Sequence, residues 1–268
     1  MKKIAVFNDL SGFGKCSLSA SLPIISACGI ECCPLPTAVF TRQTAFDGYK
    51  YYDLTDMMSS YFSDWQKEEF EGIYTGFFIN ARQMHLAKTF ICNHTEANTV
   101  LIDPVMGDNG SAYPVCTDEI LDGMKDLINY ATVITPNLTE LSMLTGVDFE
   151  SLKNSSFDYI ASVARDLFSD KLKTIIVTGI HIRGKIYNLI VSDKKYDTVS
   201  SHMFHGSFSG TGDIFASVVS AKLVSGKSVK TAVKTAVKLI SKSANATLKV
   251  NTDSRYGVQF EKYLYLLR

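Results

Sequence analysis

The chain has 268 residues, of which 46% are hydrophobic and 20% are charged, as in globular proteins with a full core. Its 27 Lys and Arg residues balance 27 Asp and Glu residues, so no global field favours binding to nucleic acid or to an anionic membrane. No apolar run approaches the roughly 20 residues of a membrane-spanning helix, so we expect a cytoplasmic protein that holds any anionic ligand in a local site.

Short apolar runs alternate with helical patterns along the chain. The predicted strands are, in order, 4–7, 72–78, 99–105, 132–136, 174–179 and 187–192. The predicted helices are 15–28, 53–69, 81–94, 117–129, 137–145, 157–169, 211–225, 228–247 and a terminal piece at 257–267. This alternation predicts an α/β fold, a three-layer doubly wound and mostly parallel sheet with helices on both faces. No repeat or linker divides the chain, so we expect one domain over residues 1–268.

A glycine-rich loop with the sequence NDLSGFGK, residues 8–15, directly follows the first predicted strand. It resembles a phosphate-binding Walker A loop, which requires the sequence G-x-x-x-x-G-K-[ST]. However, Asp9 stands where the first glycine is needed, and Cys16 stands where the metal-binding hydroxyl is needed. We therefore interpret this loop as something other than a P-loop.

Residues 31–50 fit the alternation less well, because they contain two prolines and their apolar residues follow no single period. We interpret this segment as a short strand followed by an exposed excursion. The residues leave two alternatives open, since the excursion either covers a ligand or is an ordinary connection.

The ends of five predicted strands are polar or small. They are Asn8-Asp9, Thr75-Gly76, Asp103-Pro104, Thr135-Pro136-Asn137 and Thr178-Gly179. In doubly wound sheets, ligands bind beyond the carboxyl ends of the strands. We therefore expect these residues to share one crevice.

The sequence Gly210-Thr211-Gly212-Asp213 opens a predicted helix. Glycines in this position let backbone N–H groups converge on an anion, and the positive end of the helix dipole adds to the attraction. Asp is also a favoured helix cap, so these residues alone do not decide whether Asp213 is functional or a cap.

Three ordered segments resemble the ribokinase-like superfamily of small-molecule kinases. Besides G-T-G-D, residues 103–108 (DPVMGD) and 134–140 (ITPNLTE) resemble the D-P-V-M-G and T-P-N-x-x-E segments of its vitamin-kinase branch. The order and spacing match over nearly the whole chain. The closest resemblance is to the pyridoxal (pyridoxine/pyridoxamine) kinases, with the hydroxymethylpyrimidine kinases next. It implies a homodimer that uses ATP and Mg²⁺ to phosphorylate the 5′-hydroxymethyl group of a B6 vitamer, and it leaves a monovalent-cation requirement open.

The resemblance also implies a role for each matched residue. Asp213 corresponds to the catalytic base, and the backbone of Gly210, Thr211, Gly212 and Asp213 to the anion hole for the moving phosphoryl group. The residues expected at the nucleotide phosphates are Asp103, Thr135, Asn137, Glu140, Thr178, Gly210, Thr211 and Gly212. Of these, Asp103 and Glu140 are expected to hold Mg²⁺. Read singly, Asn137 would be a helix cap, Glu140 a solvated surface residue and Asp103 a turn residue.

The residues expected to bind the substrate are Asp9, Ser11, Thr44, Phe46 and Asp213. The segment from Asp9 to Gly14 is closer to the D-P-S-G-G-x-G segment of hydroxymethylpyrimidine kinases. Thr44 matches the threonine of S-N-H-T-x-Y in pyridoxal kinases, and Phe46 replaces its tyrosine, either against the substrate ring or in the core. The alternatives to a B6-vitamer kinase are therefore a hydroxymethylpyrimidine kinase of thiamine synthesis and a non-catalytic relative that binds a vitamer or a nucleotide.

Overall fold

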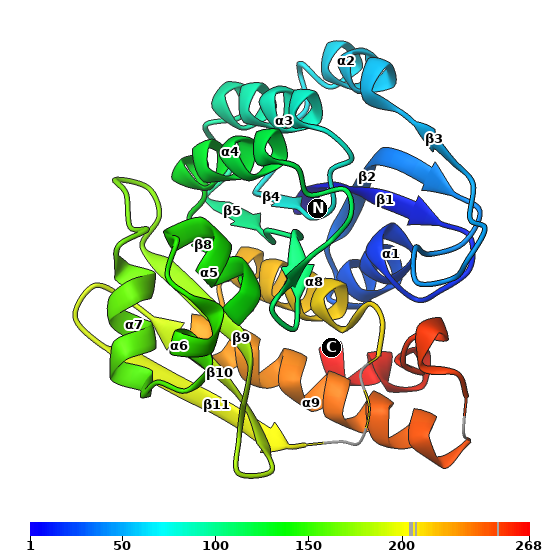
Figure 1. The fold of residues 1–268 in the computed structure, drawn as a ribbon. Helices are drawn as coiled ribbons and strands as arrows, with labels where there is room; N and C mark the ends of the chain where they lie inside the picture. The colour runs from blue at the N-terminus through cyan, green and yellow to red at the C-terminus, as the bar shows by residue number, and fades with distance from the viewer. Residues whose placement is uncertain (204–205, 207, 251) are drawn as a thin grey trace.

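A computed structural model describes residues 1–203, 206, 208–250 and 252–268, and its centre is a nine-stranded sheet (Figure 1). The strand order is β11-β10-β9-β8-β5-β4-β1-β2-β3. The strands are β1 (Lys3–Ser11), β2 (Glu31–Phe40), β3 (Tyr51–Asp53), β4 (Gly72–Thr75), β5 (Thr99–Ile102), β8 (Val133–Ile134), β9 (Thr174–Ile182), β10 (Lys185–Val191) and β11 (Tyr196–His202). All neighbours from β2 to β9 pair in parallel, whereas β3 and the β10–β11 end pair antiparallel.

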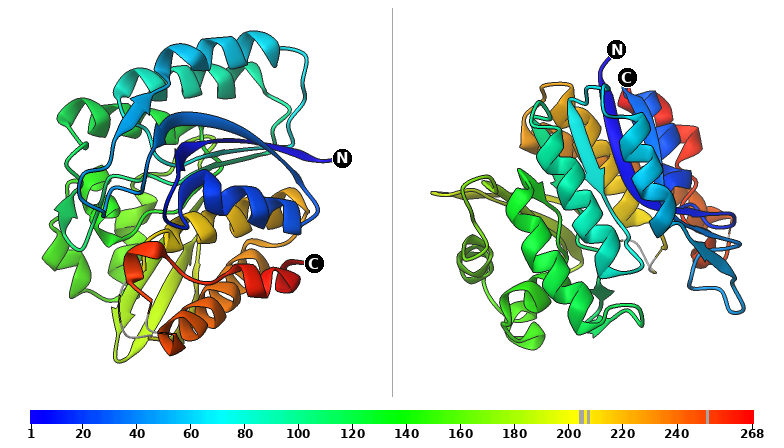
Figure 2. Two further views of the ribbon diagram at one scale, coloured as in Figure 1. Left: turned by 90° about the vertical axis from the view of Figure 1, so that its right-hand side faces the viewer. Right: turned by 90° about the horizontal axis from the view of Figure 1, so that it is seen from above.

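Helices cover both faces of this sheet (Figure 2). One face carries α2 (Thr55–Asp64), α3 (Ala81–Asn93), α4 (Asp118–Leu127), α5 (Leu138–Thr145), α6 (Phe149–Lys153) and α7 (Phe157–Arg165), with the 3₁₀ turn η1 (Ile128–Tyr130). The other face carries α1 (Ser17–Ala27), α8 (Thr211–Val224), α9 (Val229–Lys249) and the 3₁₀ helix η3 (Glu261–Leu267). Strand β1 shows the cause, because its alternate residues Ala5 and Phe7 pack into the first layer while Ile4 and Val6 pack into the second. The predicted three-layer fold is confirmed, and the single-domain organisation stays a prediction.

The segment with two prolines forms a longer strand than expected. β2 runs for ten residues and contains Pro34 and Pro36. β3 pairs only with Ala38–Phe40, so the part of β2 that contains the prolines is an edge, where a missing N–H group costs no ladder hydrogen bond. The exposed excursion follows at residues 41–50, of which only Gln43 and Phe46 are buried.

Strands β3, β6, β7 and β11 were not predicted from the sequence. The hairpin of β6 (Gly107–Asp108) and β7 (Ser111–Ala112) is only four paired residues long. Strand β11 has the sequence YDTVSSH, which lacks an apolar alternation because it is the outermost strand of the sheet.

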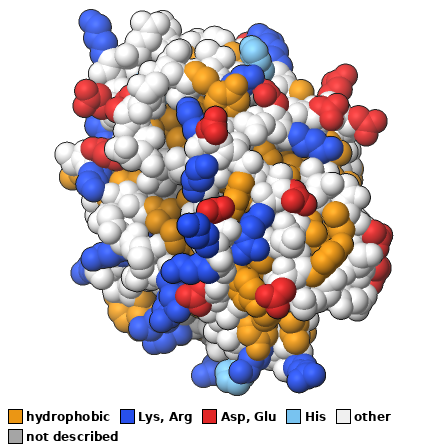
Figure 3. All heavy atoms as spheres, turned by 90° about the vertical axis from the view of Figure 1, so that its left-hand side faces the viewer, with side chains coloured by type: hydrophobic (Ala, Val, Ile, Leu, Met, Phe, Trp, Pro, Cys, Tyr) orange, Lys and Arg blue, Asp and Glu red, His pale blue; other side chains and the backbone are white. Residues whose placement is uncertain are grey.

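No helix among the described residues is long and apolar enough to cross a membrane. Figure 3 shows the face around α7, β10 and β11, where Lys and Arg side chains form a band with Asp and Glu side chains interspersed. Asp197 of β11 forms an ion pair with Lys230 of α9, and their charged groups lie 2.6 Å apart. The two signs of charge are therefore mixed on this face.

Candidate active site

The carboxyl ends of β5, β8 and β9 and the start of α8 line one cavity of about 730 Å³. Every residue predicted for catalysis and for the nucleotide phosphates lies on its wall: Asp103, Thr135, Asn137, Glu140, Thr178, Gly210, Thr211, Gly212 and Asp213. Parallel strands place their ends at one edge of a sheet, which explains how residues more than a hundred positions apart meet here.

Gly210 precedes helix α8 in a conformation that only glycine adopts without strain. Its φ is 78°, and a Cβ atom at this position would lie 2.1 Å from the carbonyl oxygen of Lys15. Close packing of the two loops thus excludes any other residue. The first N–H groups of an α-helix have no intrahelical acceptor, so the start of α8 offers donors to an anion in the cavity. Lys15 itself, the lysine of the P-loop-like sequence, pairs with Glu261 instead.

Asp213 lies in the first turn of α8, and its carboxylate is held by two other segments. The Asn8 side chain donates from Nδ2 to Asp213 Oδ1 at 2.9 Å, and the backbone N–H of Ser17 donates to the same carboxylate. The surrounding protein raises the pKa of Asp213 because it removes water from the charged form, and these hydrogen bonds oppose that rise. The sequence signals Asn8 only as a polar strand end and gives it no role.

Asp103 and Glu140 form a second pair of buried acids in the cavity. Thr135 donates from Oγ1 to Asp103 Oδ1 at 2.7 Å, and burial nevertheless raises the pKa of Asp103 to about 7. The pKa of Glu140 is also raised, first by burial and then by the charge of Asp103. The charge of Asp213 adds to the effect of burial on Asp103, and the charge of Asp103 adds to it on Glu140. Buried carboxylates on one cavity wall form an electrostatic site for a cation.

Glu140 is buried, with only 5% of the residue exposed. The interpretation of Glu140 as a solvated surface residue is therefore wrong. Its carboxylate accepts the backbone N–H groups of Asn137 at 2.8 Å and of Met106 at 3.3 Å. Asn137 in turn accepts the N–H of Glu140, which makes a capping box at the start of α5. The side chains of Asn137 and Glu140 therefore each accept from the other's backbone N–H. Asn137 is thus a helix cap, which is compatible with a role at the nucleotide.

On the other side of Asp213, Asp9 is buried and both of its oxygens are already engaged. Ser11 donates to Asp9 Oδ2 at 2.8 Å, and Ser17 donates from Oγ to Asp9 Oδ1 at 2.5 Å. Burial raises the pKa of Asp9 to about 6. Neither Asp9 nor Ser11 lines the cavity of about 730 Å³.

Thr44 and Phe46 also lie apart from that cavity. Thr44 is exposed, whereas Phe46 packs against Tyr256 and Arg255. The ring centroids of Phe46 and Tyr256 lie 5.0 Å apart, and Arg255 Cζ lies 4.7 Å from the centroid of the Phe46 ring. Phe46 lines a smaller cavity of about 250 Å³ together with Phe13. The structure thus brings the predicted phosphate side together and does not join Thr44 and Phe46 to it.

Comparison with known proteins identifies the family of the chain. Residues 16–257 match the family described as phosphomethylpyrimidine kinase. The chain belongs to the phosphomethylpyrimidine kinase family. The expected resemblance to pyridoxal kinases, with hydroxymethylpyrimidine kinases as further relatives, is thereby confirmed. The family consists of kinases that act on small molecules.

Individual members are similar to this chain over different lengths. A Bacteroides thetaiotaomicron protein classed among the phosphomethylpyrimidine kinases and crystallised with pyridoxal is 34% identical, with a TM-score of 0.93, and the match covers 99% of this chain and 95% of that one. Pyridoxal kinase from Lactobacillus plantarum, 24% identical, has the same fold with a TM-score of 0.92, covering 100% and 96% of the two chains. Pyridoxine kinase from Bacillus subtilis is 30% identical over 58% of this chain and 57% of its own length. The matched region spans about half the length of the first curated relatives.

Proposed function

We propose that the protein transfers the γ-phosphoryl group of ATP to the 5′-hydroxymethyl group of a B6 vitamer. The observation that carries this proposal is the single cavity that joins the open start of α8, the Asp213 carboxylate and the Asp103–Glu140 pair. Phosphoryl transfer requires anion donors, a proton acceptor and neutralisation of phosphate charge, and these three features supply candidates for each. The Bacteroides relative crystallised with pyridoxal supports the choice of vitamer.

In this proposal Asp213 accepts the proton of the substrate hydroxyl. As the hydroxyl oxygen bonds to the γ-phosphorus, the bond from phosphorus to the β–γ bridging oxygen breaks, and ADP leaves. The N–H groups of Thr211, Gly212 and Asp213 stabilise the charge of the moving phosphoryl group from the start of α8. Asp213 stands in the same turn of helix, so proton acceptor and anion donors are held by one rigid element.

Asp103 and Glu140 fit a magnesium ion bound together with the nucleotide. Mg²⁺ is usually held by one or two carboxylates, substrate phosphates and waters. When bound, the ion neutralises charge on the phosphates. Thr135 orients Asp103, Asn137 orients Glu140 through the capping box, and Thr178 lies on the same wall.

Hydroxymethylpyrimidine phosphorylation is the second candidate function, because the matched family carries the name of phosphomethylpyrimidine kinase. A non-catalytic relative is the third, and the presence of Asp213 beside the anion donors speaks against it. The homodimer and the cytoplasmic location stay predictions.

One coupled assay tests the proposal. Purified protein is given ATP, Mg²⁺ and, separately, pyridoxal, pyridoxine, pyridoxamine or hydroxymethylpyrimidine, and ADP release is followed. We expect the highest kcat/KM with a B6 vitamer. A clear preference for hydroxymethylpyrimidine would select the second candidate, and no ADP release above the substrate-free rate with any compound would leave only the binding relative.

A further inference from the structure

Asn8 is a fully buried polar residue of β1, and one of its side-chain hydrogen bonds reaches the proposed base Asp213. Its Oδ1 accepts the N–H groups of Asp9 and Phe77, each at 3.0 Å, while its Nδ2 donates to Asp213 at 2.9 Å. A carbonyl oxygen that accepts two N–H groups fixes which end of the amide faces Asp213. The backbone of Gly76 also packs tightly against this amide, since a Cβ atom on Gly76 would lie only 2.5 Å from Asn8 Nδ2.

The second donor to Asp213 comes from a residue in an unusual backbone conformation. Ser17 has a φ of 50°, which is uncommon for a residue with a side chain. In this conformation its N–H reaches Asp213 while its hydroxyl donates to Asp9. A sparsely populated conformation persists where the surrounding structure holds it, as here between two buried carboxylates.

In the described part of the chain, the groups whose pKa is raised by the charge of Asp213 include no cation. They are Asp9 on β1, Cys16 before α1, Tyr74 on β4, Asp103 after β5 and Tyr113 after β7. Each of these groups is either neutral or negative at physiological pH. The ionised form of this acid is favoured by neutral donors, namely the N–H of Ser17, the Asn8 amide and its own N–H, and by the positive end of the α8 dipole.

We propose that Asn8 is a positioning residue for phosphoryl transfer, which holds the Asp213 carboxylate in one orientation for the incoming hydroxyl. The inference rests on the proposed function, because Asn8 acts only through Asp213. The amide restricts the rotation of the carboxylate and favours its charged form without adding a charge of its own. A lysine in its place would favour the charged form more strongly and would make Asp213 a weaker proton acceptor.

The test is Asn8→Asp, which keeps the Oδ1 acceptor and replaces only the atom that donates to Asp213. We expect kcat to fall about 10- to 100-fold and the lower pKa of the kcat–pH profile to rise by about one unit, with KM for ATP changed less than about threefold. Asn8→Ser, which introduces no charge and is too short to reach Asp213, serves as the second variant where Asn8→Asp does not fold. It is expected to lower kcat without raising KM for ATP.

Gln83→Glu is the matched control, because it makes the same change of NH₂ to oxygen in a buried amide that does not contact Asp213. It should lower the melting temperature and leave the pH profile of kcat in place. If Asn8→Asp or Asn8→Ser matches wild type in kcat and pH profile while Asp213→Asn abolishes turnover, Asn8 is not a positioning residue although the proposed function stands. If Asp213→Asn retains normal turnover, the proposed base fails first, and with it the role of Asn8.

Discussion

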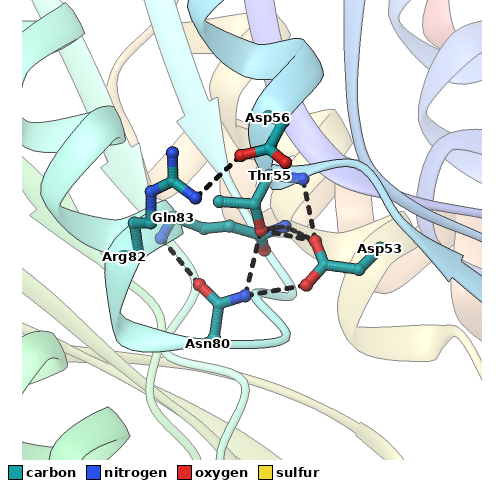
Figure 4. A network of polar contacts seen from close by, with 6 residues as sticks. All are labelled: Asp53, Thr55, Asp56, Asn80, Arg82 and Gln83. Carbon is teal, nitrogen blue, oxygen red and sulfur yellow. Dashed lines mark hydrogen bonds and ion pairs between the residues drawn. The ribbon is translucent and has the colours of Figure 1, made fainter.

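Two buried amides tie distant segments of this protein together, Asn8 beside Asp213 and Gln83 beneath the β2–β3 end of the sheet. Figure 4 shows Gln83 among Asp53, Thr55 and Asn80, with the neighbouring pair of Arg82 and Asp56. Both amides are 0% exposed. Gln83 donates to the carbonyl oxygen of Thr37 at 2.7 Å and to the Thr55 hydroxyl at 3.0 Å, and it accepts the N–H of Ile79 at 3.0 Å.

The difference between the two networks lies in what the amide holds. The network of Gln83 consists of backbone groups and side chains that satisfy one another, including Asp53, which accepts from Thr55 and Asn80. The network of Asn8 ends on a carboxylate that lines a cavity and whose pKa is raised. A saturated network stabilises the fold, whereas a network that ends on a buried charge gives up stability to keep a reactive group in place.

The largest effect should follow from changing the end of the Asn8 network. Asp213→Asn keeps the shape of the side chain but removes proton acceptance, so kcat should fall by about 100-fold or more. Nucleotide binding, measured by calorimetry, should largely survive because the backbone donors of α8 are unchanged. Near-normal turnover of this variant would reduce Asp213 to a helix cap and would remove the contrast between the two networks.

The matching change in the other network should affect stability and spare turnover. Gln83→Leu leaves the carbonyl of Thr37 and the N–H of Ile79 without their amide partner, and each buried unsatisfied group costs about 1–3 kcal/mol. Denaturant unfolding should therefore show a loss of roughly 2–4 kcal/mol, while kcat at a temperature well below the transition stays near that of wild type. A fall in kcat as large as that of Asp213→Asn would show that both networks serve the reaction.

A third substitution, Asp103→Asn, tests how the free energy of unfolding depends on pH. The pKa of Asp103 is about 7 in the folded protein, against about 3.9 in an unfolded chain. Between these values the folded protein binds more protons than the unfolded chain, so the contribution of Asp103 is full below the lower pKa and is lost as the pH rises through the upper one. Asp103→Asn should remove this loss.

The measurement is the free energy of unfolding without nucleotide, at about pH 4.5 and about pH 8. Wild type should lose more stability over this interval than Asp103→Asn, by an amount on the order of 2 kcal/mol. Equal slopes for the two proteins would mean that the Asp103 carboxylate is not destabilised by burial. Saturating Mg²⁺ and ADP should reduce the difference, because a bound cation favours the ionised form.

The phosphate side was predictable because its residues form short motifs at strand ends and at the start of a helix. The Gly210–Asp213 turn and the spacing of Asn137 and Glu140 are readable within a few positions of the sequence. The contact of Asn8 with Asp213 joins positions 205 residues apart, and no local pattern announces it. The network of Gln83 likewise joins α3 to β2, β3 and α2, so only the packed fold reveals it.

Directions of side chains were the harder part to predict. The N-x-x-E spacing predicts a capping box, but whether it faces solvent or the core depends on how α5 packs, which is why the burial of Glu140 was missed. The side-chain directions on the substrate side were even less predictable, because residues 41–50 form no regular element. Phe46 there packs against Tyr256, which lies near the other end of the chain.

The smallest effect should come from Asp9, the buried acid of β1 whose pKa the charge of Asp213 also raises. Asp9→Asn relieves a buried charge whose pKa is raised to about 6, but it also loses one of the acceptors used by Ser11 and Ser17. The first effect stabilises and the second costs about 1–3 kcal/mol, so the net change in stability near neutral pH should be within about 1 kcal/mol. Because both oxygens are already held and Asp9 does not line the large cavity, KM for the vitamer and for ATP should each change less than about threefold. A rise of about tenfold or more in KM for the vitamer alone would instead make Asp9 a contact of the substrate ring, as the resemblance to related kinases implies.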